Sequence, residues 1–222
     1  SYQVFASRAG IFGIMQGYLY LYIPLITMGL MSRELGSGSI KLLYSSPVSN
    51  CQIILGKFIS MMIYGLVLIG ILFCFVLFAA FTIKSFDFPL ILSGLLGVYL
   101  LICAYAAVGL FMSSLTSYQV VAAMLTLAVL AVLNYVKGWW QDIDFVRDIT
   151  YWLAINGRAQ EFINGLICSE DVLYFLIVIF LFLTWTVYRL INRVQKRSWT
   201  TRWGIYLGVF LVSMMLGYMS SR

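Results

Sequence analysis

The 222-residue chain contains no histidine and few charged side chains. Charged residues make up 10% of it, against roughly 25% in soluble domains. The absence of histidine removes the commonest metal ligand and the commonest general base. Because 63% of the residues are hydrophobic, too little charge is left for a water-soluble surface. The chain is therefore predicted to be an integral membrane protein.

Catalytic and nucleotide-binding motifs are also absent from the sequence. It has no HExxH or GxSxG pattern, and no pair among its four cysteines has metal-ligand spacing. The segment GSGSIK at 36–41 lacks the spacing of a phosphate-binding loop, and Gly56-Lys57 is followed by phenylalanine. We expect a chain that is not an enzyme, binds no cofactor or metal of its own and does not bind nucleic acid.

Long apolar stretches predict transmembrane helices, because about 20 mostly apolar residues suffice to cross a bilayer. We place six of them, approximately at 10–31, 58–82, 90–112, 119–136, 172–192 and 203–219. Only a very short polar turn separates the third from the fourth, so we expect these two to form a tight helical hairpin. None holds an Asp, Glu or Arg at mid-membrane depth, which argues against a self-powered, ion-coupled transporter. The expected fold is an all-α, polytopic bundle of membrane helices.

The connecting segments fall into two sets of different charge. One set comprises 32–57, 113–118 and 189–202 and has a net charge of +7. The other set comprises 1–9, 83–89, 137–171 and 220–222 and has a net charge of −1. Because Lys and Arg gather on the cytosolic side of membrane proteins, the first set is predicted to face the cytosol. Both chain ends and the loop 137–171 are then expected on the outside.

The polar segment 32–57, which we call the elbow, separates the first two apolar runs. It contains the charged pair Arg33 and Glu34, a glycine-serine turn, a short amphipathic piece and a Ser-Pro break. A segment of this kind suits docking onto another protein.

The same residues resemble the ABC-2 type transporter permeases, the membrane subunits of one class of ABC exporter. The likeness rests on an apolar run with Pro and Met at 23–28, on Arg33 and Glu34 with Gly36, on the Ser-Pro turn at 42–49 and on Ile-x-x-Gly-Lys at 53–57. It covers about 10–197 and is nearest to the gliding-motility and nitrous-oxide-reductase-maturation branch. Two positions differ from the family pattern, since Leu35 replaces a second acid and Lys41 replaces a glutamate.

The resemblance implies that a separate cytosolic ABC ATPase dimer holds ATP and Mg²⁺ and that a single elbow helix, 33–45, is its coupling helix. It implies a type V-like exporter of the bacterial cytoplasmic (inner) membrane, in which a second permease copy or a paralogue completes the path. The residues expected to contact the ATPase or to shape that contact are Arg33, Glu34, Gly36, Ile40, Leu42, Leu43, Tyr44 and Pro47. The chain would couple ATP hydrolysis to export or to an extracytoplasmic mechanical task. The alternative is a membrane scaffold that anchors an extracytoplasmic partner without transporting solute.

Aromatic residues recur at roughly helical intervals among acids in the loop 137–171. Such rings favour the headgroup zone, so we expect one or two interfacial or re-entrant helices on the outer surface. They form either a simple cap on the bundle or an outer gate. The gate residues would be Trp139, Trp140, Phe145 and Trp152.

Two segments of the chain are expected to differ in origin. Residues 1–197 are predicted to be the permease transmembrane domain, without the first span of the family. Residues 198–222 are predicted to be an additional C-terminal transmembrane segment that, by the same resemblance, anchors a downstream extracytoplasmic domain. An extracytoplasmic auxiliary subunit is a further expected partner of the chain. The chain would then be a piece of a longer polypeptide.

Overall fold

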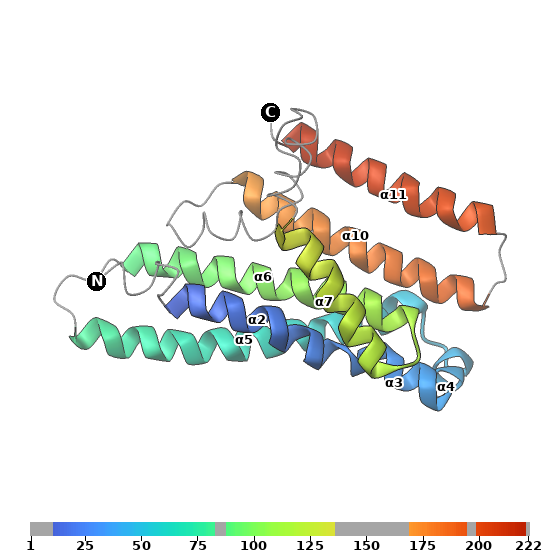
Figure 1. Cartoon of the computed structure of the whole chain (residues 1–222), viewed down its shortest axis with the longest axis horizontal. Helices are drawn as coiled ribbons and strands as arrows, with labels where there is room; N and C mark the ends of the chain where they lie inside the picture. Colours follow the sequence, from blue (N-terminus) through green and yellow to red (C-terminus); the bar gives the residue numbers. More distant parts are fainter. Residues whose placement is uncertain (1–10, 83–87, 136–168, 195–198, 221–222) are drawn as a thin grey trace.

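A computed structural model describes residues 11–82, 88–135, 169–194 and 199–220, and these ranges are helical with short connections. The helices, shown in Figure 1, are α2 (Ile11–Thr27), α3 (Gly29–Ser37), α4 (Ile40–Ser45), α5 (Asn50–Thr82), α6 (Phe88–Leu115), α7 (Gln119–Tyr135), α10 (Ser169–Val194) and α11 (Trp199–Ser220). The predicted all-α membrane bundle is confirmed.

Four stretches are long and apolar enough to cross a membrane, namely Gly13–Ser37, Asn50–Phe78, Phe88–Leu115 and Ser169–Arg193. The other two predicted spans are also helical, with shorter apolar stretches at Gln119–Leu133 and Trp203–Gly217. Helix α5 has 33 residues. At 1.5 Å per residue it is about 50 Å long, against roughly 30 Å of hydrocarbon in a bilayer. It must therefore extend beyond the hydrocarbon at one or both of its ends.

Helix α6 is the centre of the bundle. It packs against α2, α3, α5, α7 and α10, and nearly all of its residues from Ser93 to Ser114 are buried. A helix that is apolar on every side has no face suited to water, and α6 is enclosed by the neighbouring helices of the bundle. At Gly109 a Cβ atom would overlap the hydroxyl of Thr27, so glycine permits the close approach of α2 and α6.

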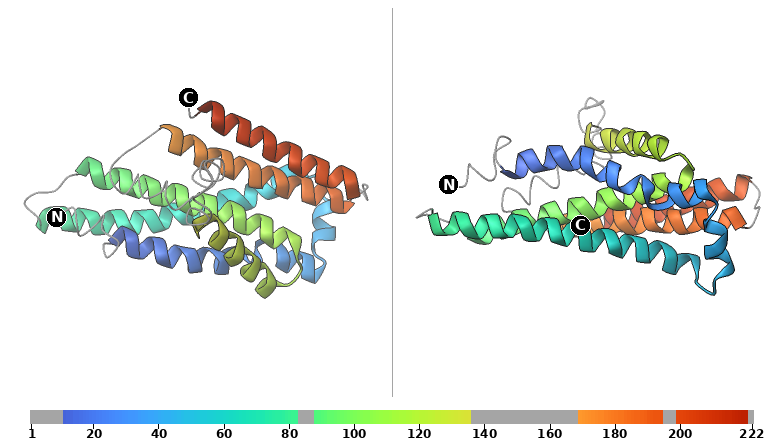
Figure 2. Two further views of the ribbon diagram at one scale, coloured as in Figure 1. Left: turned by 45° about the horizontal axis from the view of Figure 1, so that its top comes forward. Right: turned by 90° about the horizontal axis from the view of Figure 1, so that it is seen from below.

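Helix α11 lies at the edge of the bundle and packs mainly against α10 (Figures 1 and 2). Aromatic rings join the two, with the Trp185 centroid 5.9 Å from that of Tyr206 and 6.4 Å from that of Phe210. An apolar groove of ≈ 440 Å³ runs between them. An edge helix of this kind exposes most of its surface to lipid.

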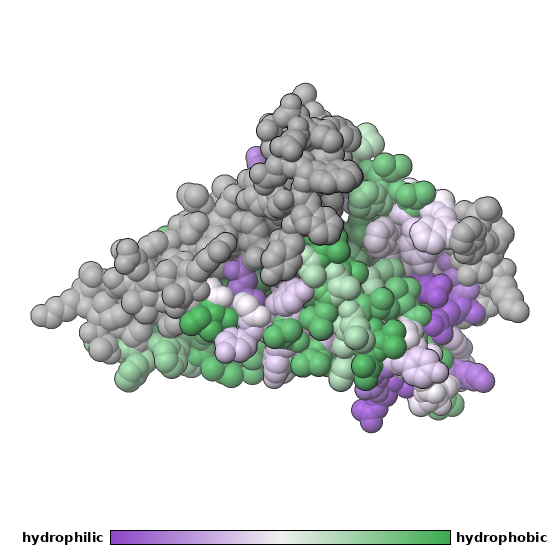
Figure 3. Space-filling model, in the orientation of Figure 1, coloured by the Kyte–Doolittle hydropathy of each residue, from purple (hydrophilic) through white to green (hydrophobic). Residues whose placement is uncertain are grey.

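The connections gather at one end of the bundle, which we call the elbow end. It holds α3, α4, the start of α5 and the turn between α6 and α7, and α10 ends and α11 begins there (Figures 1 and 2). The predicted tight hairpin is confirmed, since α6 ends at Leu115 and α7 begins at Gln119. Figure 3 shows hydrophilic residues collected at this end and hydrophobic ones along the middle. The elbow end is therefore the polar end of an apolar bundle.

Candidate functional site in the elbow

The first span is broken between α2 and α3. Helix α2 ends at Thr27, one turn after Pro24, and α3 begins at Gly29. Proline has no amide hydrogen and its ring clashes with the preceding turn, which weakens a helix at that point. The amide of Met28 donates to the carbonyl of Pro24 at 3.0 Å, so the chain changes course without losing that bond. The break leaves the first amides of α3 without partners in their own helix.

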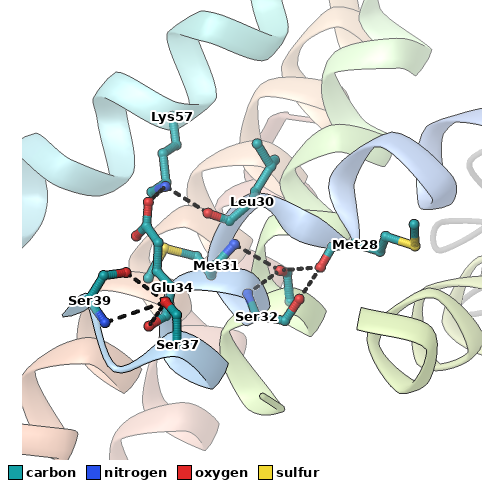
Figure 4. A network of polar contacts seen from close by, with 9 residues as sticks. Met28, Leu30, Met31, Ser32, Glu34, Ser37, Ser39 and Lys57 are labelled. Carbon is teal, nitrogen blue, oxygen red and sulfur yellow. Dashed lines mark hydrogen bonds and ion pairs between the residues drawn. The ribbon is translucent and has the colours of Figure 1, made fainter. Parts of the chain in front are cut away.

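Ser113 of α6 supplies the missing partner at this break (Figure 4). Its Oγ accepts from the amides of Met31 at 2.9 Å and Ser32 at 3.0 Å, and it donates to the carbonyl of Met28 at 2.9 Å. The Ser113 side chain is fully buried. It acts as a helix cap provided by a neighbouring helix rather than by the preceding residue. The start of α3 is thereby fixed to the centre of the bundle.

Lys57 of α5 fixes the other side of α3. Its Nζ lies 2.6 Å from Oε1 of Glu34 and donates to the carbonyl of Leu30, also at 2.6 Å (Figure 4). The two charged side chains are 19% and 30% exposed, so water screens their attraction only in part. Among the residues that the structure describes, this is the one ion pair. It joins α3 to the first turns of α5.

Two glycines shape the end of α3. A Cβ at Gly36 would lie 2.9 Å from the carbonyl oxygen of Ser117, so only glycine lets α3 approach the α6–α7 turn this closely. Gly38 has φ 75°, the left-handed conformation that commonly ends a helix. The hydroxyls of Ser37 and Ser39 are 2.9 Å apart across this residue (Figure 4). The chain therefore turns at Gly38 and starts a new helix.

Helix α4 has six residues and is held far less tightly. Ile40 is buried, and Tyr44 packs against the core. Leu42 lies on the other side and is 73% exposed. After α4 the chain is extended to Ser49, which caps α5 by accepting from the amide of Gln52 at 3.3 Å while Gln52 Oε1 accepts from the amide of Ser49 at 3.0 Å. This reciprocal capping box sets the start of α5.

The structure corrects one sequence-based expectation about the elbow. The predicted single helix 33–45 is wrong, because the left-handed Gly38 divides it into the end of α3 and the separate α4. The predicted residues on α3 are Arg33, Glu34 and Gly36, those on α4 are Ile40, Leu42, Leu43 and Tyr44, and Pro47 follows α4. The chain therefore presents two short surfaces, one per helix, rather than a continuous one.

The predicted residues also differ in how accessible they are. Arg33, Gly36, Leu42 and Pro47 are exposed, Glu34, Leu43 and Tyr44 are half-buried, and Ile40 is buried. Whether the exposed ones contact a partner stays a prediction. The expected gate residues Trp139, Trp140, Phe145 and Trp152 lie outside the described residues.

A hollow of ≈ 470 Å³ borders the break between α2 and α3. It is lined by the end of α2, by α3, by Lys57 of α5 and by Gln119 at the start of α7. Arg33 is among its lining residues. The wall is partly polar and partly apolar, which fits a position where the bundle meets water. Open space on this side leaves α3 room to shift.

The fold and the elbow together define a multi-pass helical membrane protein with a polar surface at one end. The family model described as ABC-2 family transporter protein matches residues 3–141, more than half of the chain. The chain belongs to this family. The match includes α2 to α7 and the whole elbow. No curated protein and no solved structure matches the chain.

Membership of the family has direct consequences for the chain. ABC-2 proteins are the membrane components of ABC transporters, generally without catalytic activity of their own. ATP hydrolysis belongs to a partner, so membership implies an ABC ATPase that acts with this chain. The protein is a membrane permease subunit of an ABC transporter.

Proposed function

We propose that the elbow couples ATP hydrolysis by a separate cytosolic ABC ATPase dimer to export, or to a mechanical task outside the membrane. The observation that carries this proposal is that α4, an exposed helix, directly follows α3, a helix that is firmly bonded to the bundle. Leu42 of α4 is 73% exposed, whereas the adjoining α3 is bound to α5, α6 and the α6–α7 turn. A contact made on α4 would reach the bundle through α3.

The bonds that attach α3 to the bundle favour the transmission of a movement of α3 to α5 and α6. Ser113 and Lys57 belong to different helices, and each of them bonds to backbone atoms of α3. Backbone groups do not move away when a side chain rotates, so a displaced α3 would pull on α5 and α6. Rigid-body movement of packed helices is a common way for a local contact to produce a larger change. The hollow beside the break gives that movement space.

The charges of the elbow end support a cytosolic position for it. Basic residues there include Arg33, Lys41, Lys57, Arg189 and Arg193, and Glu34 is the single acid among the residues described at this end. Positively charged segments stay on the cytosolic side. We place the protein in the bacterial inner membrane with the loop 137–171 on the outside.

Within the elbow, the contacts are assigned by exposure. Leu42 would be the apolar anchor, and Pro47, just after α4, would be a second exposed contact, since buried apolar anchors carry most of the energy of an interface. Ile40 and Tyr44 would hold α4 on the bundle instead of meeting the ATPase. Glu34 and Gly36 would act through α3, by the ion pair and by the close approach to Ser117.

The remaining components of the transporter are proposed from the family. ATP and Mg²⁺ would be held by the ATPase dimer, and a second copy of this chain or a paralogue would complete the path. The gliding-motility and nitrous-oxide-reductase-maturation branch stays our proposal for the subfamily. An extracytoplasmic auxiliary subunit would fit the same branch.

The test is the exchange Leu42→Asp in the complete transporter purified from its native host. We expect permease-stimulated ATP hydrolysis to fall about tenfold or more, because a buried anchor contributes roughly 2 kcal/mol or more to an interface. Tyr118→Asp is the matched control: Tyr118 is 74% exposed at the same end, on the α6–α7 turn. Stimulated hydrolysis should be retained in that control.

Two results would contradict the proposal. Equal losses in both variants would show that the whole polar end, rather than α4, meets the ATPase. Unchanged hydrolysis in Leu42→Asp would favour a scaffold that does not communicate with an ATPase through its elbow.

A further inference from the structure

A second polar cluster lies at the elbow end, on the side of α10. It is formed by Tyr44 of α4, Ser114 at the end of α6 and the last two turns of α10. Nη2 of Arg193 donates to the carbonyl of Ser114 at 3.4 Å, and Arg193 is within electrostatic reach of Tyr44. The α10 members of the cluster are Arg189, Asn192 and Arg193.

Three polar atoms in this cluster are buried and have no hydrogen-bond partner among the described residues. They are the hydroxyl of Tyr44, Nε of Arg189 and Nδ2 of Asn192. Asn192 as a whole is only 5% exposed. A buried donor without a partner costs about 1–3 kcal/mol, and native proteins contain few of them. Three of them at the end of α10 and on the neighbouring α4 indicate a partner that they share.

Every one of these atoms can donate a hydrogen bond. Arg189 Nε and Asn192 Nδ2 are donors only, and the phenol of Tyr44 can donate as well as accept. Burial raises the pKa of the Tyr44 phenol, with Arg193 opposing in part, so Tyr44 keeps its proton at neutral pH. The missing partner must therefore be rich in acceptors.

The charges at the cluster also indicate a partner rich in hydrogen-bond acceptors, and specifically a negatively charged one. Arg189 and Arg193 lie one turn apart on α10 and repel each other. The described carboxylates are Glu34, which pairs with Lys57, and Glu170 and Asp171 at the other end of α10. That end is about 27 Å away along the helix at 1.5 Å per residue. The cluster thus holds two cations without a described anion.

We propose that this cluster binds a phosphate group at the membrane surface. Phosphate offers several acceptor oxygens, and guanidinium groups bind it with short, charge-assisted bonds. Two sources share this chemistry, the headgroup of an anionic phospholipid and free phosphate. The cluster lies where α10 leaves the membrane, and basic pockets between membrane helices at such a level bind anionic headgroups. The proposal does not depend on α4 docking an ATPase.

The test is native mass spectrometry of the full chain in detergent, titrated with phosphatidylglycerol, phosphatidylcholine or inorganic phosphate. Both lipids carry a phosphate, but the choline cation of phosphatidylcholine is repelled by Arg189 and Arg193, so we expect one phosphatidylglycerol to bind about tenfold more tightly than phosphatidylcholine. Arg189→Gln and Arg193→Gln should each remove this preference. Tyr44→Phe, which deletes only a hydroxyl and keeps the ring in place, should weaken it by about threefold.

Arg33→Gln is the matched control, because it removes an exposed positive charge from the same end but from the hollow on the α2–α3 side. The preference should be unchanged in it. Saturable binding of inorganic phosphate with the same variant pattern would assign the site to free phosphate, and binding of the lipid alone would assign it to a headgroup.

Two results would overturn the proposal. An equal loss in Arg33→Gln would show a general effect of surface charge. Binding of neither ligand by the purified chain would show that the donors serve another partner, such as an acidic side chain of the ATPase.

Discussion

The two helices of the elbow, α3 and α4, are neighbours in sequence but are held in opposite ways. Helix α3 is bonded by Ser113 and Lys57 and touches the α6–α7 turn at Gly36. Helix α4 rests on the bundle through Ile40 and Tyr44 and leaves Leu42 exposed. Gly38 separates the two. A clamped helix can pass on a force, and an exposed helix can recognise a partner, so the elbow divides these tasks between two helices.

The largest effect on the clamped helix is expected from Ser113→Ala. The exchange leaves the buried amide of Met31 without a partner and should lower the free energy of unfolding by about 2 kcal/mol. Ser114→Ala is the control, since the Ser114 hydroxyl bonds only within its own helix, to Phe111 at 2.6 Å. Thermal unfolding of the permease in detergent measures the stability of both variants. Similar melting of the two variants would mean that the cap contributes little.

A smaller loss is expected from Lys57→Met. The exchange removes the bonds to Glu34 and to the carbonyl of Leu30 and should cost about 1 kcal/mol, because the pair is partly exposed. Adding Glu34→Gln to it should cost little more, since the charge left behind by the first exchange is removed. Lys41→Met, at an exposed lysine of α4, serves as the control. Chemical unfolding of these variants beside the parent chain shows whether the two exchanges are coupled.

The smallest effect on the permease alone is expected on α4. Leu42→Asp should change its free energy of unfolding by less than about 0.5 kcal/mol, because the side chain is exposed. The same variant should still lose stimulated ATP hydrolysis. A large drop in melting temperature would mean that Leu42 supports the fold, and the contrast between α3 and α4 would then fail.

The helices themselves could be predicted from the sequence, because apolar runs of membrane length have few other uses. The α6–α7 hairpin and the position of the elbow followed from the polar interruptions between those runs. The division of the elbow at Gly38 was missed, although the Gly-Ser-Gly pattern indicates a turn: a helix was placed across it to make one docking segment. The left-handed conformation of Gly38 interrupts an α-helix, and the single predicted helix 33–45 did not take it into account.

The bonds by which Ser113 and Lys57 hold α3 could not be predicted from the sequence. Ser113 and Met31 are 82 positions apart, and Ser113 is one of several serines next to a turn. Lys57 fits a motif of the elbow, but its partner Glu34 lies 23 positions earlier. The buried donors of α10 carried no signal either, since basic residues at a helix end are common in membrane proteins. Contacts between distant positions depend on packing, which local patterns do not encode.

The central claim is that α4, rather than α3 or the α6–α7 turn, meets the ATPase. A photoreactive phenylalanine derivative placed at Leu42, in cells that express the whole transporter, tests it most directly. The account predicts a crosslink from this position to a protein that peptide sequencing identifies as an ABC ATPase, and none from the same group at Tyr118. A crosslink from Tyr118 but not from Leu42, or labelling of lipid alone at Leu42, would contradict it.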